Sequence, residues 1–146
     1  MDVEIEHIDE AEKELVLIRC RAVTDEVREI ADFVKSRQGR LMGVQEGMRY
    51  EVPLPDVHYI ESVDGRTFLY TKDQVFETPY RIYELESRLA DKHFLRISKS
   101  MLLNLMKVGS IRPAFNGRFV AMLRSGEEVI VSRSYVKGLK AALKGE

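Results

Sequence analysis

The sequence predicts a mainly β protein of the α+β class: a domain of short antiparallel sheets with small helices, preceded by an N-terminal strand–helix–strand extension. Two observations support this prediction. From Met48 onward the chain breaks into short β-prone segments that are separated by turn signals such as Asp64-Gly65. Before Met48 the pattern differs, because one β-prone run is followed by one amphipathic helical run. We place the two parts at residues 1–47 and 48–146.

The N-terminal part starts with an acidic, polar stretch and continues into a β-prone run from Leu15 to Cys20. Thr24 is a favourable helix N-cap, because its hydroxyl can accept a hydrogen bond from the first helical turn. Apolar residues then recur at helical spacing, and Gly39 fits a helix stop. A second strand is expected before residue 47. Two roles are open for this extension: protecting an edge of the following sheet, or serving as a dimerisation or partner-docking element.

The remaining elements follow from turn signals and periodicity. Segments 57–63 and 66–71 flank Asp64-Gly65, a dipeptide that suits the positive φ angles of a two-residue hairpin. A short strand at 75–77 and a helix over 82–89 come next. Asn116-Gly117 and Ser125-Gly126 predict two more hairpin turns, and Val136, Leu139 and Leu143 lie on one face of a closing helix.

Several classes of function lack support in the residues. The one cysteine, Cys20, excludes an intrachain disulfide framework and fits a reducing cytoplasm. His7, His58 and His93 are scattered singly, and none has a Cys, Asp or Glu at metal-ligand spacing. The chain shows no phosphate-binding Gly-rich loop, no nucleophile elbow and no apolar run that could span a bilayer. We therefore expect a cytoplasmic protein that is not an enzyme and uses no metal or cofactor.

The charge of the chain reverses near residue 96. Residues 1–95 contain 13 Lys and Arg against 21 Asp and Glu, whereas residues 96–146 contain 10 against 3. The net charge of −1 therefore conceals an acidic part of −8 and a basic part of +7. A basic part of this size attracts phosphate, and the attraction should weaken with salt.

The basic charges are not a run, since they occur singly beside predicted turns and helix starts. Loops on a rigid β scaffold can reach into a groove of a duplex, where short polar side chains read base edges. We expect 98–100 to begin a short helical turn, 116–118 to form a hairpin tip, and 132–135 to open the last helix with free N–H groups. The alternative is a solvated face with ordinary turn residues. The candidate DNA-binding residues are Arg96, Ser98, Lys99, Ser100, Asn116, Arg118, Arg133, Ser134, Tyr135 and Lys137.

Residues 48–146 resemble the LytTR DNA-binding domain, the output module of LytR/AgrA-type response regulators. Three motifs carry the resemblance in the right order: residues 56–62 (DVHYIES), 94–104 (FLRISKSMLLN) and 131–140 (VSRSYVKGLK). The resemblance implies a mostly β domain in which two loops enter successive major grooves of bent duplex DNA. By position these loops are 98–100 and the region around 133–135. The tip at 116–118 is our candidate for the intervening minor groove.

The resemblance also implies partners, and this chain departs from the family in two ways. It implies a cytoplasmic bacterial transcription regulator that binds double-stranded DNA as a homodimer on paired direct repeats. The family commonly has His where this chain has Ser98, so site preference is expected to differ. Only 47 residues precede the domain, too few for a receiver domain, so we expect a stand-alone regulator. Short proteins of this layout are often restrained by a small membrane protein.

Two alternatives come from other classes. The chain could be a protein-interaction or anti-regulator module that keeps the LytTR scaffold without reading DNA, and the absence of His at position 98 leaves this alternative open. It could also bind RNA, since Phe115, Phe119 and Tyr135 accompany the basic residues. No RNP-like stacking run is present, which makes RNA the weaker alternative.

Overall fold

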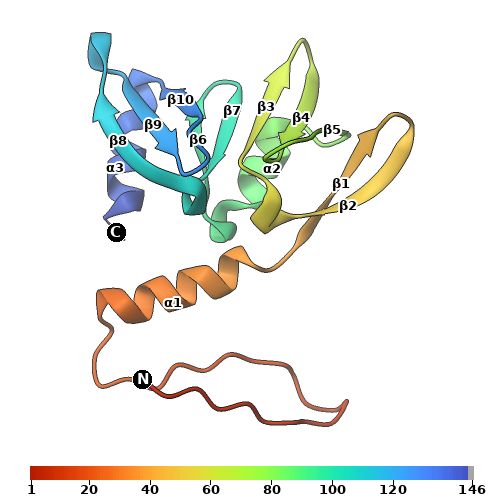
Figure 1. The fold of residues 1–146 in the computed structure, drawn as a ribbon, viewed down its shortest axis with the longest axis vertical. Helices are drawn as coiled ribbons and strands as arrows, with labels where there is room; N and C mark the ends of the chain where they lie inside the picture. Colours follow the sequence, from red (N-terminus) through yellow and green to blue (C-terminus); the bar gives the residue numbers. More distant parts are fainter. Residues whose placement is uncertain (145–146) are drawn as a thin grey trace.

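A computed structural model describes residues 1–144. Two antiparallel sheets lie beside each other, and an N-terminal arm and a long helix lie below them (Figure 1). The prediction of a mostly antiparallel fold with small helices is confirmed. Among the described residues, none of the helices is both long and apolar enough to cross a membrane.

The first sheet has seven strands and the second has three. The order in the first is β2-β1-β5-β4-β3-β7-β6, and in the second it is β10-β9-β8. Their bounds are β1 Arg40–Gln45, β2 Met48–Pro53, β3 Tyr59–Val63, β4 Arg66–Tyr70, β5 Val75–Thr78, β6 Phe94–Ser98, β7 Met101–Asn104, β8 Val108–Pro113, β9 Phe119–Leu123 and β10 Glu128–Val131. The helices are α1 Asp25–Ser36, α2 Ile82–Arg88 and α3 Val136–Leu143, with 3₁₀ turns η1 Leu54–Asp56, η2 Ala90–Lys92, η3 Leu105–Lys107, η4 Phe115–Gly117 and η5 Arg133–Tyr135.

Helix α1 forms as its sequence predicts. The Thr24 hydroxyl accepts a hydrogen bond from the Val27 N–H at 3.3 Å, which satisfies one of the free donors of the first turn. The helix is tied to the sheets through Asp32, whose Oδ1 lies 3.3 Å from His93 Nε2. Strand β1 then joins the first sheet, because it pairs with β2 and with β5. The expected division between residues 47 and 48 therefore falls in the turn of the β1–β2 hairpin.

The strand predicted at residues 15–20 is wrong. Residues 1–23 contain no helix or strand, although their backbone is described throughout. A β-prone sequence becomes a strand only when a neighbouring strand accepts its hydrogen bonds, and within residues 1–144 no backbone hydrogen bond pairs this run with another segment. The N-terminal extension is therefore an extended arm followed by α1 and β1, rather than strand, helix and strand.

Two hydrophobic clusters stabilise the sheets. The first contains Leu85 and Leu89 of the α2 region against the first sheet, and the second contains Val136 and Leu139 of α3 against the second sheet. Tyr59 connects the sheets: its ring belongs to the second cluster, and its hydroxyl donates a 2.6 Å hydrogen bond to Glu127 in the β9–β10 turn. Burial and the neighbouring carboxylate raise the pKa of Tyr59, so its phenol stays a donor.

Candidate nucleic-acid interface

The turn at residues 98–100 is the tip of the β6–β7 hairpin. The expected helical turn is wrong here, because strand pairing continues up to Ser98 and Met101. A register shift between Arg96 and Ser98 turns Ile97 fully into the core. A bulge of this kind re-aims the residues beside it. The side chain of Lys99 is exposed at the tip, while the Ser98 hydroxyl accepts a 3.2 Å hydrogen bond from the Ser100 N–H.

Arg96 supports this tip from below. Its Nε donates to the Ser98 carbonyl at 2.8 Å, and its Nη2 donates to the Lys99 carbonyl. Its Nη1 lies 2.8 Å from Glu86 of α2, and only 16% of the side chain is exposed. The planar guanidinium therefore fixes the turn to α2 in one geometry. A direct contact between Arg96 and DNA stays a prediction, but the structure gives this residue a supporting role.

The segment 132–135 lies against the same part of β6. The Ser132 N–H donates to the Ile97 carbonyl at 2.9 Å, next to the bulge. The 3₁₀ turn η5 then begins at Arg133, and the Tyr135 N–H donates to the Ser132 carbonyl at 2.9 Å. Tyr135 packs on the second cluster, so its ring anchors a segment in which Arg133 and Ser134 are exposed. Lys137 is exposed one turn further along, on α3.

The tip of the β8–β9 hairpin lies against Arg133. Asn116 and Gly117 have φ angles of +60° and +75°, as the turn signal predicts. A Cβ built on Gly117 would lie 2.7 Å from the Arg133 Cδ, so the Arg133 side chain lies directly against the backbone of the hairpin tip. Arg118 is exposed, and its Nε donates to the Phe115 carbonyl at 3.2 Å.

The structure thus brings the three predicted segments together. We call residues 98–100, 115–118 and 132–135 the turn cluster. The 132–135 segment is its centre, since it contacts β6 at Ile97 and the hairpin tip at Gly117. No local sequence pattern predicts these contacts, because they depend on how the second sheet packs beside the end of β6.

The charges of the turn cluster are available to a ligand. Among residues 1–144, no carboxylate lies within ion-pair distance of Lys99, Arg118 or Arg133. By contrast, Arg112 on β8 is paired with Glu128 at 3.3 Å. Unpaired cations on fixed backbone can neutralise phosphates without first breaking an internal ion pair. No group of three or more His, Cys, Asp or Glu that could hold a metal occurs in the described part of the chain.

Phe115 is a residue whose position the sequence analysis did not anticipate. It begins the tip of the β8–β9 hairpin and is 87% exposed, which is unusual for a large aromatic side chain. It is exposed because the hairpin tip protrudes. An aromatic residue in a sequence does not by itself indicate such a position. Phe115 stands next to Asn116 and Arg118, so the tip offers an apolar surface as well as a charge.

A small β scaffold that presents exposed cations and short polar side chains on a cluster of turns is the organisation of a nucleic-acid-binding module. The chain belongs to the LytTR family: residues 48–144 match the family model described as the LytTr DNA-binding domain. The solved structure described as the LytTr DNA-binding domain of a putative methyl-accepting/DNA response regulator from Bacillus cereus has the same fold, with a TM-score of 0.68 and 24% identity over 73% of this chain and 97% of that one.

Curated relatives are longer than this chain. The chain is 38% identical over 86 residues to the transcriptional regulatory protein YpdB of Escherichia coli (strain K12), covering 58% of this chain and 35% of YpdB. It is 30% identical over 110 residues to the sensory transduction protein LytT of Enterococcus faecalis, covering 75% of this chain and 46% of LytT. The chain thus spans less than half the length of either relative.

Proposed function

We propose that this chain regulates transcription by binding a specific duplex DNA site with its turn cluster. The observation that carries the proposal is the convergence of three turns on a domain of the LytTR family, with exposed cations that have no ion pair among residues 1–144. The names of the relatives YpdB and LytT, a transcriptional regulatory and a sensory transduction protein, support the regulatory part.

The proposed mechanism divides the contacts by the position of each turn. Lys99 and the 98–100 tip enter one major groove, and Arg133 with Ser134 enters the next. Asn116 and Arg118 reach the minor groove between them. Lys137 contacts phosphate, and Tyr135 holds the 132–135 segment in place. Phosphate contacts supply most of the affinity, while the side chains at base edges select the sequence.

The proposal includes a homodimer on paired direct repeats and a small membrane protein as the restraining partner. A dimer doubles the contacted length of DNA, so its affinity for two correctly spaced sites exceeds that of one domain for one site. Ser98 replaces the larger imidazole common in the family, so Lys99 takes a greater share of the contact in the first groove.

The test is fluorescence anisotropy of the purified protein. The probe is a labelled duplex from upstream of its own gene, with a scrambled duplex of the same composition as control, across a salt series. We expect tighter binding to the upstream duplex and a log affinity that falls linearly with log salt. No binding at low salt would overturn the proposal and favour the protein-interaction module. Stronger competition by single-stranded RNA than by duplex would favour an RNA partner.

A further inference from the structure

The N-terminal arm, residues 1–23, exposes an unusual density of apolar side chains. Of the seventeen large hydrophobic side chains that are exposed in the described chain, eight belong to the arm: Met1, Val3, Ile5, Ile8, Leu15, Val16, Leu17 and Val23. The arm lies outside both sheets, below α1 (Figure 1). Concentrated exposed apolar surface of this kind marks an interaction site.

The backbone of the arm is equally unpartnered. Within residues 1–21, all of which the structure describes, the one backbone–backbone hydrogen bond joins the Glu12 N–H to the Asp9 carbonyl at 3.3 Å, and it closes the turn at the far end. The two sides of the arm therefore present free N–H and C=O groups, which are a template for pairing with another strand.

The two sides of the arm differ in charge. Residues 1–14, the acidic limb, contain seven Asp and Glu and one Lys, whereas residues 15–23, the basic limb, contain two Arg and no acidic residue. Both limbs are β-prone: Val3 and Ile5 alternate with Glu4, and Leu15 begins an apolar run of four residues. The limbs are therefore complementary in charge, −6 against +2, and both are rich in apolar side chains.

The positions of the limbs indicate a register. Met1 and Cys20 line the same hollow of the arm. Antiparallel pairing in the register that places Met1 opposite Cys20 would also place Ile5 opposite Val16 and put an acidic residue opposite Leu17. On one face of such a pair Met1, Val3 and Ile5 meet apolar partners. On the other face Asp2 lies opposite Arg19, whereas Glu4 and Glu6 lie opposite Leu17 and Leu15.

We propose that the arm binds a second copy of this chain, with the acidic limb of one copy paired antiparallel to the basic limb of the other. The partner is a second copy because each chain carries both complementary limbs, so two equal joins form and close a two-fold dimer. A lone two-stranded hairpin is marginal in water, which agrees with the limbs being unpaired in one chain; four strands can bury both apolar faces. The inference rests on the homodimer of the proposed function and names its contact.

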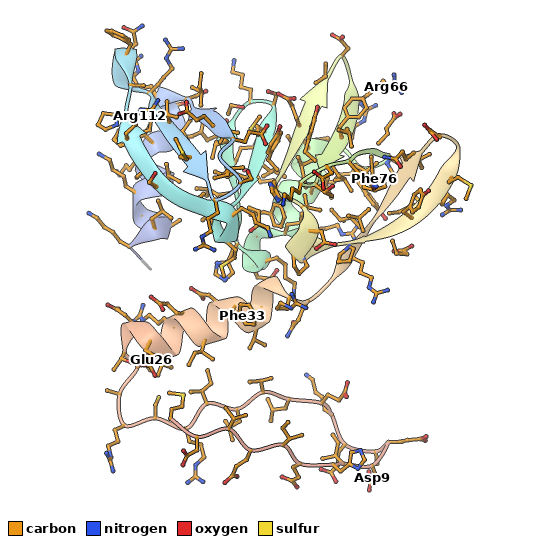
Figure 2. All side chains as sticks on the ribbon, in the orientation of Figure 1. Asp9, Glu26, Phe33, Arg66, Phe76 and Arg112 are labelled. Atoms are coloured by element: carbon orange, nitrogen blue, oxygen red, sulfur yellow. The ribbon has the colours of Figure 1, made fainter. Side chains whose placement is uncertain are left out.

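The position of the arm fits this role. Asp9 lies at the tip of the arm, at the end of the molecule opposite Arg112 on β8 (Figure 2). The β8–β9 tip likewise lies at the end opposite the arm (Figure 1). A dimer joined through the arms therefore leaves the turn cluster of each copy accessible to DNA.

The first experiment measures the dimerisation constant of the full chain by sedimentation equilibrium without DNA. We expect Leu17→Asp, which sets a carboxylate against the acidic limb, to weaken dimerisation by at least about tenfold. Leu17→Lys should weaken it less, because the ammonium faces carboxylates. Tyr83→Asp on α2 is the matched control, since Tyr83 is 65% exposed and Leu17 is 70% exposed, and it should leave the constant unchanged. A monomeric wild-type chain, or equal effects of Leu17→Asp and Tyr83→Asp, would overturn the inference.

The second experiment tests which limbs meet. One chain carries Ile5→Cys with Cys20→Ser, and the other carries Val16→Cys with Cys20→Ser. A short thiol crosslinker should join the two chains in a mixture more than either chain to itself. A mixture with Tyr83→Cys in place of Val16→Cys is the control and should give little product. Equal product in both mixtures would overturn the pairing of the limbs.

Anisotropy on the same proteins separates the two proposals. A monomer that binds DNA refutes the arm contact alone, and a dimer that binds no DNA refutes the DNA site alone.

Discussion

The side chain of Arg133, in the 132–135 segment, lies across Gly117 at the tip of the β8–β9 hairpin. A Cβ added to Gly117 would stand 2.7 Å from the Arg133 Cδ and 2.9 Å from its Cγ. Gly117 also has a φ of +75°, in the left-handed region that favours glycine. The placement of the Arg133 guanidinium therefore depends on a glycine in a different hairpin.

Gly117→Ala should impair DNA recognition by moving Arg133. The new methyl group cannot share the space of the Arg133 Cδ, so the arginine must leave its position across the tip. We expect specific binding to weaken by about tenfold. The left-handed backbone adds a strain of about 1 kcal/mol, which should lower the melting temperature by about 2–4 °C.

Gly65→Ala is the control for this strain. Gly65 has a φ of +78° in the β3–β4 turn, and a Cβ there would meet nothing within 4 Å. This variant should lose a similar amount of stability while binding the operator like wild type. Parallel thermal melts and anisotropy titrations distinguish the two effects. Equal loss of DNA binding in both variants would show that Gly117 acts only through stability.

Arg133→Ala should remove a specific contact without a structural penalty. The side chain is exposed and has no ion pair within the described residues, so its loss should leave the melting temperature nearly unchanged. Specific binding should weaken by at least about tenfold. Arg66→Ala on β4 removes the same charge away from the turn cluster and should bind normally. A large fall in stability of Arg133→Ala would mean that Arg133 is structural and that the assignment of this loop is wrong.

The sequence predicted those parts of the fold that local chemistry determines. Thr24 caps α1, and Asp64-Gly65 and Asn116-Gly117 turn the chain at positive φ, because these preferences belong to the residues themselves. The run at Leu15 was predicted as a strand for the same local reason. It is not one within this chain, because a strand also needs a neighbour, and β propensity does not supply one.

The candidate site was predictable in its members but not in their roles. The cations beside turns could be found from spacing and charge. The sequence could not show that Arg96 turns inward to the Ser98 carbonyl and Glu86, or that Ser132 meets Ile97. The Arg96–Glu86 pair joins β6 to α2, and the Ser132–Ile97 hydrogen bond joins the segment before α3 to β6. Both depend on tertiary packing rather than on any periodicity.

Replacing Arg96 should change the stability of the domain, whereas replacing Lys99 should not. Arg96→Ala removes three hydrogen-bond donors from the β6–β7 tip and leaves Glu86 unpaired, so stability and DNA binding should fall together. Lys99→Ala removes an exposed charge, so it should leave stability unchanged and reduce the slope of log affinity against log salt by about 1. Melts and salt-dependent titrations test both. If Arg96→Ala melted like wild type yet lost DNA binding, its guanidinium would be a direct contact.

His58 should make the domain less stable in mild acid. Its side chain is buried at the start of β3, and burial, with the nearby Lys107, lowers the pKa of the imidazole below its ordinary value of 6.5. As the pH falls below about 6.5, His58 is therefore protonated in the unfolded chain before it is protonated in the folded chain. The free energy of unfolding decreases as a result. Above that pH both states are neutral, and His58 contributes no pH dependence.

Urea unfolding of wild type and His58→Gln between pH about 7.5 and 5 measures this effect by linear extrapolation. The difference in the free energy of unfolding between the two proteins should be constant above pH about 6.5. Below that pH the wild type should lose stability relative to His58→Gln. Taking the difference removes the contribution of the carboxylates, such as Glu77, whose pKa is held low by Arg66 in both proteins. A difference that stays constant over the whole range would show that His58 binds protons equally in the folded and unfolded chains.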